Sequence, residues 1–191
     1  MALLSHKTDA QEIELIITGN AMKNFHKVLR KNLKIESMSY SFETELVSRD
    51  RQGYVEERQC ACTVPDFTLQ KVSKVIFYTE NIANYINNSF TKIYNRKVFD
   101  KIIPVVIAYL LAHETVHVFQ VQVGRLTRDI HEGEKKLSYK ERPTEIEADN
   151  RALEIMKNCD IFTLKICNLV KERKCADSKD VDELMKSFKE E

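Results

Sequence analysis

The chain has 191 residues, of which 43% are apolar and 31% charged, with only four glycines and three prolines. This composition predicts one soluble, helix-rich globular domain and excludes a fibrous, disordered or low-complexity protein. Thirty Lys and Arg against twenty-nine Asp and Glu leave a net charge of +1, so no net field attracts nucleic acid or an anionic membrane surface. We therefore expect neither as a partner.

The sequence indicates a cytoplasmic protein. Its longest apolar run, residues 102–112, is interrupted by Pro104 and is much shorter than the roughly 20 residues of a membrane-spanning helix. The first ten residues lack the features of a secretory signal. The cysteines are odd in number and have no paired C-x-x-C spacing, so we expect mostly buried thiols: Cys60, Cys62, Cys159, Cys167 and Cys175.

The N-terminal part begins with a predicted strand over residues 11–18 (QEIELIIT). Gly19 and Asn20 predict a stop, and an amphipathic helix is expected over residues 21–33. The basic residues of this helix, His26 included, are expected on a solvated face.

A small antiparallel sheet is expected next. Residues 34–44 and 58–64 partly alternate between apolar and polar side chains, and residues 75–78 (VIFY) are β-branched or aromatic. Residues 45–57 are expected to form a long loop. Residues 81–95 predict a helix, although the asparagines at positions 81, 84, 87 and 88 disfavour it.

The clearest helix is expected over residues 104–123, with Pro104 in its first turn and Gly124 as its stop. It is apolar on nearly all sides, which predicts that it is buried in the middle of the domain. Its polar residues, His113, Glu114 and His117, then need partners inside the protein.

The remaining chain predicts further helices. A charged connection over residues 125–142 leads to a second firm helix over residues 143–158, and two shorter helices are expected over residues 161–171 and 180–189. The fold class is thus α+β, in one domain. Residues 1–123 hold the sheet and the buried helix, and residues 124–191 form a helical part.

A metal-binding pattern lies on the buried helix, where residues 113–117 read H-E-x-x-H. Positions i and i+4 of a helix differ by about 40° in direction, so both imidazoles can bind one cation. Glu114 is rotated by about 100° from His113 and can act as a general base without being a ligand. The alternative is a hydrogen-bonded core network, but each unpaired buried polar group costs about 1–3 kcal/mol.

The helix over residues 143–158 offers the third protein ligand that a catalytic zinc needs. Glu145 and Asp149 are one turn apart on one face. We expect Glu145 on the metal and Asp149 accepting the free ring N–H of a ligand histidine. Glu147 stays an alternative ligand, although Thr144 and Glu147 also fit a capping box and Glu147 and Arg151 an i,i+4 ion pair.

The two patterns together resemble a known family. H-E-x-x-H followed by E-x-E-A-D, which begins twenty-eight residues after His117, looks like the gluzincin group of zinc metallopeptidases. Residues 110–120 (LLAHETVHVFQ) are similar to small bacterial or phage-associated members, including minimal zincins. The resemblance covers two helices.

Carried over to this chain, the resemblance implies a zincin-like fold and a role for each matched residue. His113, His117 and Glu145 would bind Zn²⁺, Glu114 would be the base, and Asp149 would orient a histidine.

The resemblance also implies two features that the motifs do not locate. One is a side chain that stabilises the oxyanion, for which His131, Tyr139 and Arg142 are candidates. The other is a strand at the upper rim of the cleft, expected at residues 75–78, to whose edge a peptide substrate would add. The alternative for residues 75–78 is an ordinary interior strand.

Two functions are expected from this site. The first is a zinc-dependent metallopeptidase, a hydrolase of a peptide or protein substrate, in which the metal polarises the carbonyl and its water and Glu114 takes the proton. The second is a zincin-fold binding or regulatory module that retains zinc with little or no proteolysis, favoured by the lack of an obvious oxyanion donor. Chance motifs in a metal-free helical protein are the third alternative. The sequence indicates neither the substrate nor the oligomeric state.

Overall fold

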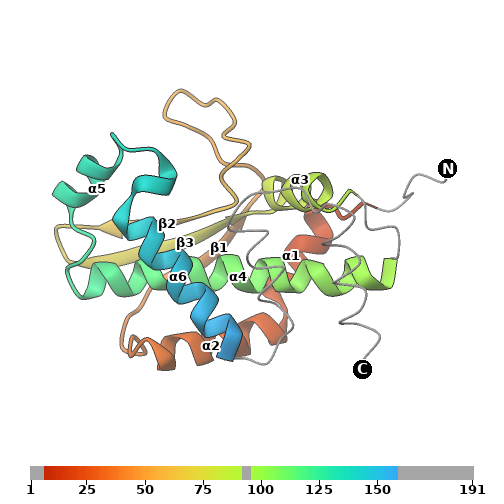
Figure 1. Cartoon of the computed structure of the whole chain (residues 1–191), viewed down its shortest axis with the longest axis horizontal. Helices are drawn as coiled ribbons and strands as arrows, with labels where there is room; N and C mark the ends of the chain where they lie inside the picture. The colour runs from red at the N-terminus through yellow and green to blue at the C-terminus, as the bar shows by residue number, and fades with distance from the viewer. Residues whose placement is uncertain (1–6, 92–95, 159–191) are drawn as a thin grey trace.

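The fold was analysed in a computed structural model, which describes residues 7–91 and 96–158. These residues form an α+β arrangement of helices and a three-stranded sheet (Figure 1), which confirms the expected class. The elements in chain order are α1 (Ala10–Thr18), α2 (Asn20–Asn32), β1 (Ser41–Glu45), β2 (Ala61–Asp66), β3 (Lys71–Tyr78), α3 (Thr79–Ser89), α4 (Arg96–Gln122), α5 (Arg128–Glu134), the 3₁₀ helix η1 (Tyr139–Glu141) and α6 (Pro143–Asn158). The helices expected over residues 161–171 and 180–189 lie outside the described residues.

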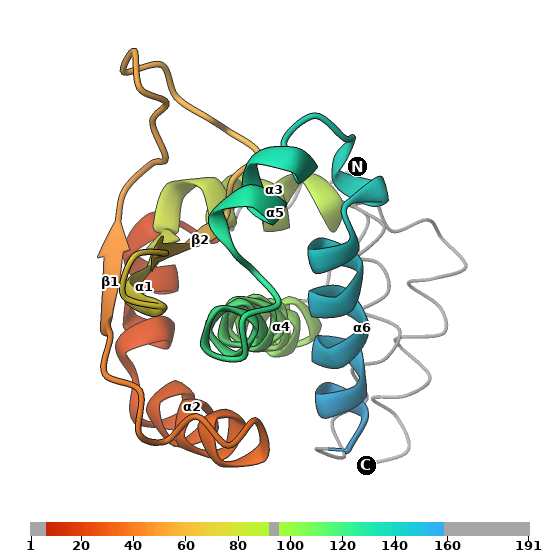
Figure 2. The same ribbon diagram turned by 90° about the vertical axis from the view of Figure 1, so that its left-hand side faces the viewer.

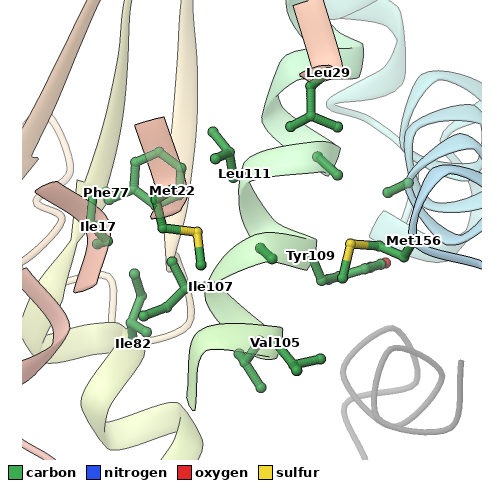
Figure 3. Packing of buried hydrophobic residues seen from close by; sticks show 14 of the residues in the cluster. Ile17, Met22, Leu29, Phe77, Ile82, Val105, Ile107, Tyr109, Leu111 and Met156 are labelled. Carbon is green, nitrogen blue, oxygen red and sulfur yellow. The ribbon is translucent and has the colours of Figure 1, made fainter. Parts of the chain in front are cut away.

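Helix α4 lies in the middle of the molecule, as the apolar sequence predicts. Figure 2 looks almost along its axis and shows α1 and α2 on one side and α6 on the opposite side. In Figure 3, Ile107 and Leu111 point toward Met22 and Phe77, whereas Tyr109 lies on the side of α6. The residues that carry the motif are therefore held by packing on several sides.

Within the described residues, which resume at Arg96, helix α4 already extends eight residues before Pro104, so the expected start was wrong. Phe99, Ile102 and Ile103 are buried at helical spacing, and Arg96 pairs with Glu12 of α1 at 2.7 Å. Packing of this first part outweighs the backbone hydrogen bond that a proline inside a helix removes.

The length of α4 bears on whether it could cross a membrane. Among the described residues, the segment Phe99–Gln122 is long and apolar enough to cross a bilayer, and 83% of its most apolar stretch is buried inside the protein. The apolar run over residues 102–112 ends just before His113, whereas α4 continues through this residue to Gln122. Core helices of soluble proteins share these properties, so the helix carries no conclusion on membranes.

The sheet is mixed, which corrects the expected antiparallel one. Its strand order is β1-β3-β2, in which β3 pairs antiparallel with β2 and parallel with β1. The antiparallel pairing of β2 with β3 agrees with the expectation, whereas β1 pairs with β3 in parallel and not with β2. Thr63 and Phe77 lie on the same face of the sheet. Thr63 contacts Glu114 of α4, so this face packs toward α4.

The N-terminal segment is helix α1, so the predicted strand was wrong. Ile13, Leu15 and Ile17 alternate along the chain like residues of a strand, but Leu15 is exposed and the two isoleucines are buried one helical turn apart. The carboxylate of Asp9 accepts the backbone N–H of Glu12 at 2.8 Å and caps the helix.

Helix α2 follows almost as predicted, with exposed lysines. His26 corrects the expectation of a solvated face, because its ring is partly buried against Tyr40 and Phe42. Cys60 and Cys62 are only partly buried, which is also less than expected. The other three cysteines lie outside the described residues.

Candidate metal centre

Three side chains from two helices converge on one point. The Nε2 atoms of His113 and His117 are 3.0 Å apart, and Oε2 of Glu145 lies 3.2 Å and 3.3 Å from them. The helical spacing of four places both imidazoles on one side of α4, and α6 brings Glu145 to the same side. The three residues form a group that could hold a metal ion.

Close approach of α4 and α6 depends on small residues. Ala148 and Ala152 have no exposed surface, and Met156 of the same face is also fully buried. The first alanine lies between Glu145 and Asp149, so the two carboxylates can reach the face of α4 that carries the histidines.

Asp149 contacts the outer nitrogen of one histidine. Its Oδ1 lies 3.0 Å from Nδ1 of His113 and accepts a hydrogen bond from the hydroxyl of Tyr109 at 2.7 Å. Because a carboxylate only accepts, it favours a proton on Nδ1 and leaves Nε2 directed at Glu145. Tyr109 is part of this arrangement, although the sequence analysis did not single it out.

Charge in the cluster shifts the pKa values of its members. Burial acts to lower the pKa of His113, but the contacts with Asp149 and Glu145 outweigh it, and the pKa is raised. Burial acts to raise the pKa of Glu145, whereas the two histidines lower it well below its usual range. The cluster therefore favours a positive charge between the Nε2 atoms of the two histidines and Oε2 of Glu145.

Glu114 lies beside this group and is held in place by a residue of the sheet. The hydroxyl of Thr63 on β2 is 2.8 Å from Oε2 of Glu114 and 3.1 Å from its backbone carbonyl. Both residues line the same cleft as the histidines. The carboxylate is thus buried, oriented and separate from the three converging atoms, as a base requires.

Glu147 does not join the converging group. Its Oε1 accepts from Arg125 at 2.5 Å and from Arg151 at 3.0 Å, which confirms the predicted i,i+4 pair with Arg151. The capping box with Thr144 was wrong, because Thr144 donates its N–H and its hydroxyl to Glu134 instead.

All three oxyanion candidates line the cleft, but at different places. The hydroxyl of Tyr139 lies 3.5 Å from Nε2 of His113. His131 packs edge-on against Phe67, and Arg142 donates to the carbonyl of Leu137. Tyr139 is the candidate that touches the converging group.

The strand beside the site is β2, which corrects the expectation for residues 75–78. Those residues belong to β3, whose two sides are already paired with β1 and β2. Within the described residues, β2 pairs on one side only, and it carries the Thr63 that contacts Glu114. Of the two edge strands, β2 is therefore the one that lies beside the site.

The converging group opens to a large cleft of about 1530 Å³. Its walls come from the 46–60 loop, β2, α3, the 124–142 connection and the first half of α6, with His113, Glu114, His117 and Glu145 among its lining residues. The 46–60 loop projects beyond the sheet and is visible at the top of Figure 1.

Sequence reasoning did not single out three side chains of this site. Tyr109 and Gln120 lie four residues before His113 and three after His117, so helical spacing places each near a motif histidine. Thr63 has no such signal, because its contact with Glu114 spans fifty-one residues.

Comparisons with known proteins leave the site to be interpreted on its own geometry. A scan against protein-family models finds no match. Searches of curated proteins and of solved structures find none either.

Proposed function

We propose that the protein is a zinc-dependent metallopeptidase with a zincin-like fold of the gluzincin type. His113, His117 and Glu145 would hold Zn²⁺, and Glu114 would be the general base. The observation that carries the proposal is the convergence of these three donor atoms beside a separate, oriented carboxylate in a large cleft.

The residues fit zinc by chemistry and by spacing. Two imidazole nitrogens and one carboxylate oxygen are a ligand set of catalytic zinc sites. Two donors bound tetrahedrally at about 2.0–2.1 Å lie about 3.3 Å from each other, and the three distances here are 3.0, 3.2 and 3.3 Å. Without a metal ion, the raised pKa of His113 means that a proton lies between its Nε2 and Glu145.

The chemistry divides between the ion and the chain. Zn²⁺ in such a site acts as a Lewis acid on a carbonyl and lowers the pKa of water. Glu114 would accept the proton of the attacking water and pass it to the leaving amine. Thr63 would keep the Glu114 carboxylate directed into the cleft, and the hydroxyl of Tyr139, 3.5 Å from Nε2 of His113, would donate to the oxyanion.

The cleft suits a peptide better than a small molecule. Its volume of about 1530 Å³ exceeds the roughly 300–1,000 Å³ of ordinary ligand pockets. The neighbouring strand β2 offers backbone groups on its outer side, to which an extended peptide main chain can pair.

The test is hydrolysis of a peptide library by the purified protein with and without a zinc chelator. The proposal predicts cleavage that the chelator stops and added zinc restores. The Glu114→Gln variant should lose hydrolysis by at least about 100-fold and keep its zinc, because Glu114 is not among the proposed ligands. Stoichiometric zinc without any hydrolysis would reject the peptidase and favour a binding module that retains the metal.

A further inference from the structure

Gln120 makes the contact with His117 that Asp149 makes with His113. Its side chain has no exposed surface, and its Oε1 lies 2.8 Å from Nδ1 of His117. It comes from the same helix, one turn after the motif.

The orientation of the Gln120 amide follows from its other partners. Nε2 lies 2.9 Å from the backbone carbonyl of Thr144 and 3.1 Å from Oε2 of Glu147. Both partners accept hydrogen bonds and neither donates, so the NH₂ group must face them. The carbonyl oxygen of the amide is then the atom that faces His117.

The same logic determines where His117 carries its proton. An oxygen acceptor beside Nδ1 requires an N–H there, and a neutral imidazole has one N–H only. The carboxylate of Glu145 also faces Nε2 of His117. A proton held on Nδ1 by Gln120 is therefore what leaves the lone pair of Nε2 available to an ion bound beside His113 and Glu145. We infer that Gln120 is a positioning residue that holds His117 in the Nδ1–H tautomer required for binding the ion through Nε2.

Glu147 extends this arrangement to the surface. Its Oε1 is occupied by Arg125 and Arg151, which leaves Oε2 for the amide of Gln120. Glu147 therefore acts through Gln120 and not as a ligand. The inference rests on the proposed zinc site, because it names the group that orients one of the three proposed ligands.

A purely structural role is the competing explanation, since Gln120 also joins α4 to α6 through Thr144. The two explanations differ in the state of the imidazole. Loss of a helix contact changes stability, whereas loss of the acceptor also releases the proton of His117 to either nitrogen.

The first experiment measures that tautomer by ¹⁵N NMR of the histidine rings in metal-free protein at pH 8. We expect the Nδ1–H form of His117 in the wild type, where the amide oxygen of Gln120 accepts that proton. We expect a mixture of tautomers in Gln120→Met, which has a similar length and no such acceptor. The wild-type spectrum alone decides the assignment, even if a variant does not fold.

The second experiment measures zinc affinity by competition with a chromophoric chelator, with circular dichroism to verify the fold. Loss of the partner of a ligating histidine typically weakens metal binding about 10- to 100-fold, and we expect this for Gln120→Met. Gln122→Met is the matched control, because Gln122 lies on α4 but lines a small pocket with Ser37 and Gln70. It should bind zinc like the wild type.

An Nε2–H tautomer of His117 in the wild type would overturn the inference. So would a Gln120→Met variant with the tautomer and the zinc affinity of the wild type. Because the NMR measurement needs neither zinc nor a substrate, it separates this inference from the proposed function. A protein that cleaves no peptide but loses the tautomer in Gln120→Met would reject the peptidase and support the role of Gln120.

Discussion

The hydroxyl of Thr63 lies 2.8 Å from the carboxylate of Glu114 and joins strand β2 to helix α4 across fifty-one residues. This contact orients the proposed base from the sheet, independently of the two helices that carry the proposed ligands. The candidate site is thus built on three elements, of which the sequence motifs mark two.

Replacing Thr63 by Val should impair the base without affecting the metal. A hydrogen bond to a charged group contributes about 1.5–3 kcal/mol, so we expect kcat on a cleaved peptide to fall about 10-fold or more. Zinc content should stay the same. Thr63→Ser, which keeps the hydroxyl, should retain most of the activity, and equal losses in both variants would contradict the role of this contact.

Tyr139→Phe tests the oxyanion donor. The variant removes only the hydroxyl that lies 3.5 Å from His113, and loss of one such donor costs about 100- to 1,000-fold in kcat. We expect KM and zinc affinity to change little. His131→Asn is the comparison, since that ring packs against Phe67; a larger loss of kcat there would assign the role to His131.

The packing of α4 against α6 should limit both stability and metal binding. Ala148 is fully buried at this contact, so Ala148→Leu overpacks it at a cost of about 1–3 kcal/mol. The displacement also moves Glu145 and Asp149, and we expect weaker zinc binding. Glu154→Leu, at an exposed position of the same helix, is the control in chemical unfolding and zinc titration. Equal zinc affinity in Ala148→Leu and wild type would contradict this account.

His26 should make stability depend on pH. Burial and then the charge of Arg30 lower its pKa to about 4, whereas an unfolded histidine has a pKa of about 6.5. The unfolded chain therefore binds more protons between these values, and the free energy of unfolding falls as pH falls from about 6.5 to 4.

The contribution of His26 should be about 1–2 kcal/mol, after allowance for the partial exposure of the ring. Urea unfolding of metal-free protein across this range measures it. His26→Gln should flatten the pH dependence, and Lys27→Gln, at the exposed neighbouring position, should not. An unchanged slope in His26→Gln would show that another group titrates.

Much of the candidate site could be predicted from the sequence, because it depends on helical periodicity. The spacing of His113 and His117, and of Glu145 and Asp149, places each pair on one side of a helix. The start of α6 also agreed with the prediction, since Pro143 begins the helix. Local patterns do not reveal a partner from a distant element, such as Thr63, which contacts Glu114.

The N-terminal half was harder to predict because tertiary contacts decide it. Leu15 completes an alternation typical of a strand, yet it is an exposed residue of a helix. The position of β3 between β1 and β2 depends on pairing across a long loop, which alternation along one strand does not reveal. Pro104 was assigned to a first turn on propensity, whereas burial of the preceding residues extends α4 beyond it.

The most direct test of the central claim is the zinc content per chain, measured by elemental analysis after dialysis against buffered zinc. We predict about one zinc ion per chain in the wild type and a large loss in Glu145→Ala, with Glu147→Ala retaining more zinc than Glu145→Ala. A wild type without zinc, or a Glu145→Ala variant that binds zinc as tightly as the wild type, would contradict the proposed site.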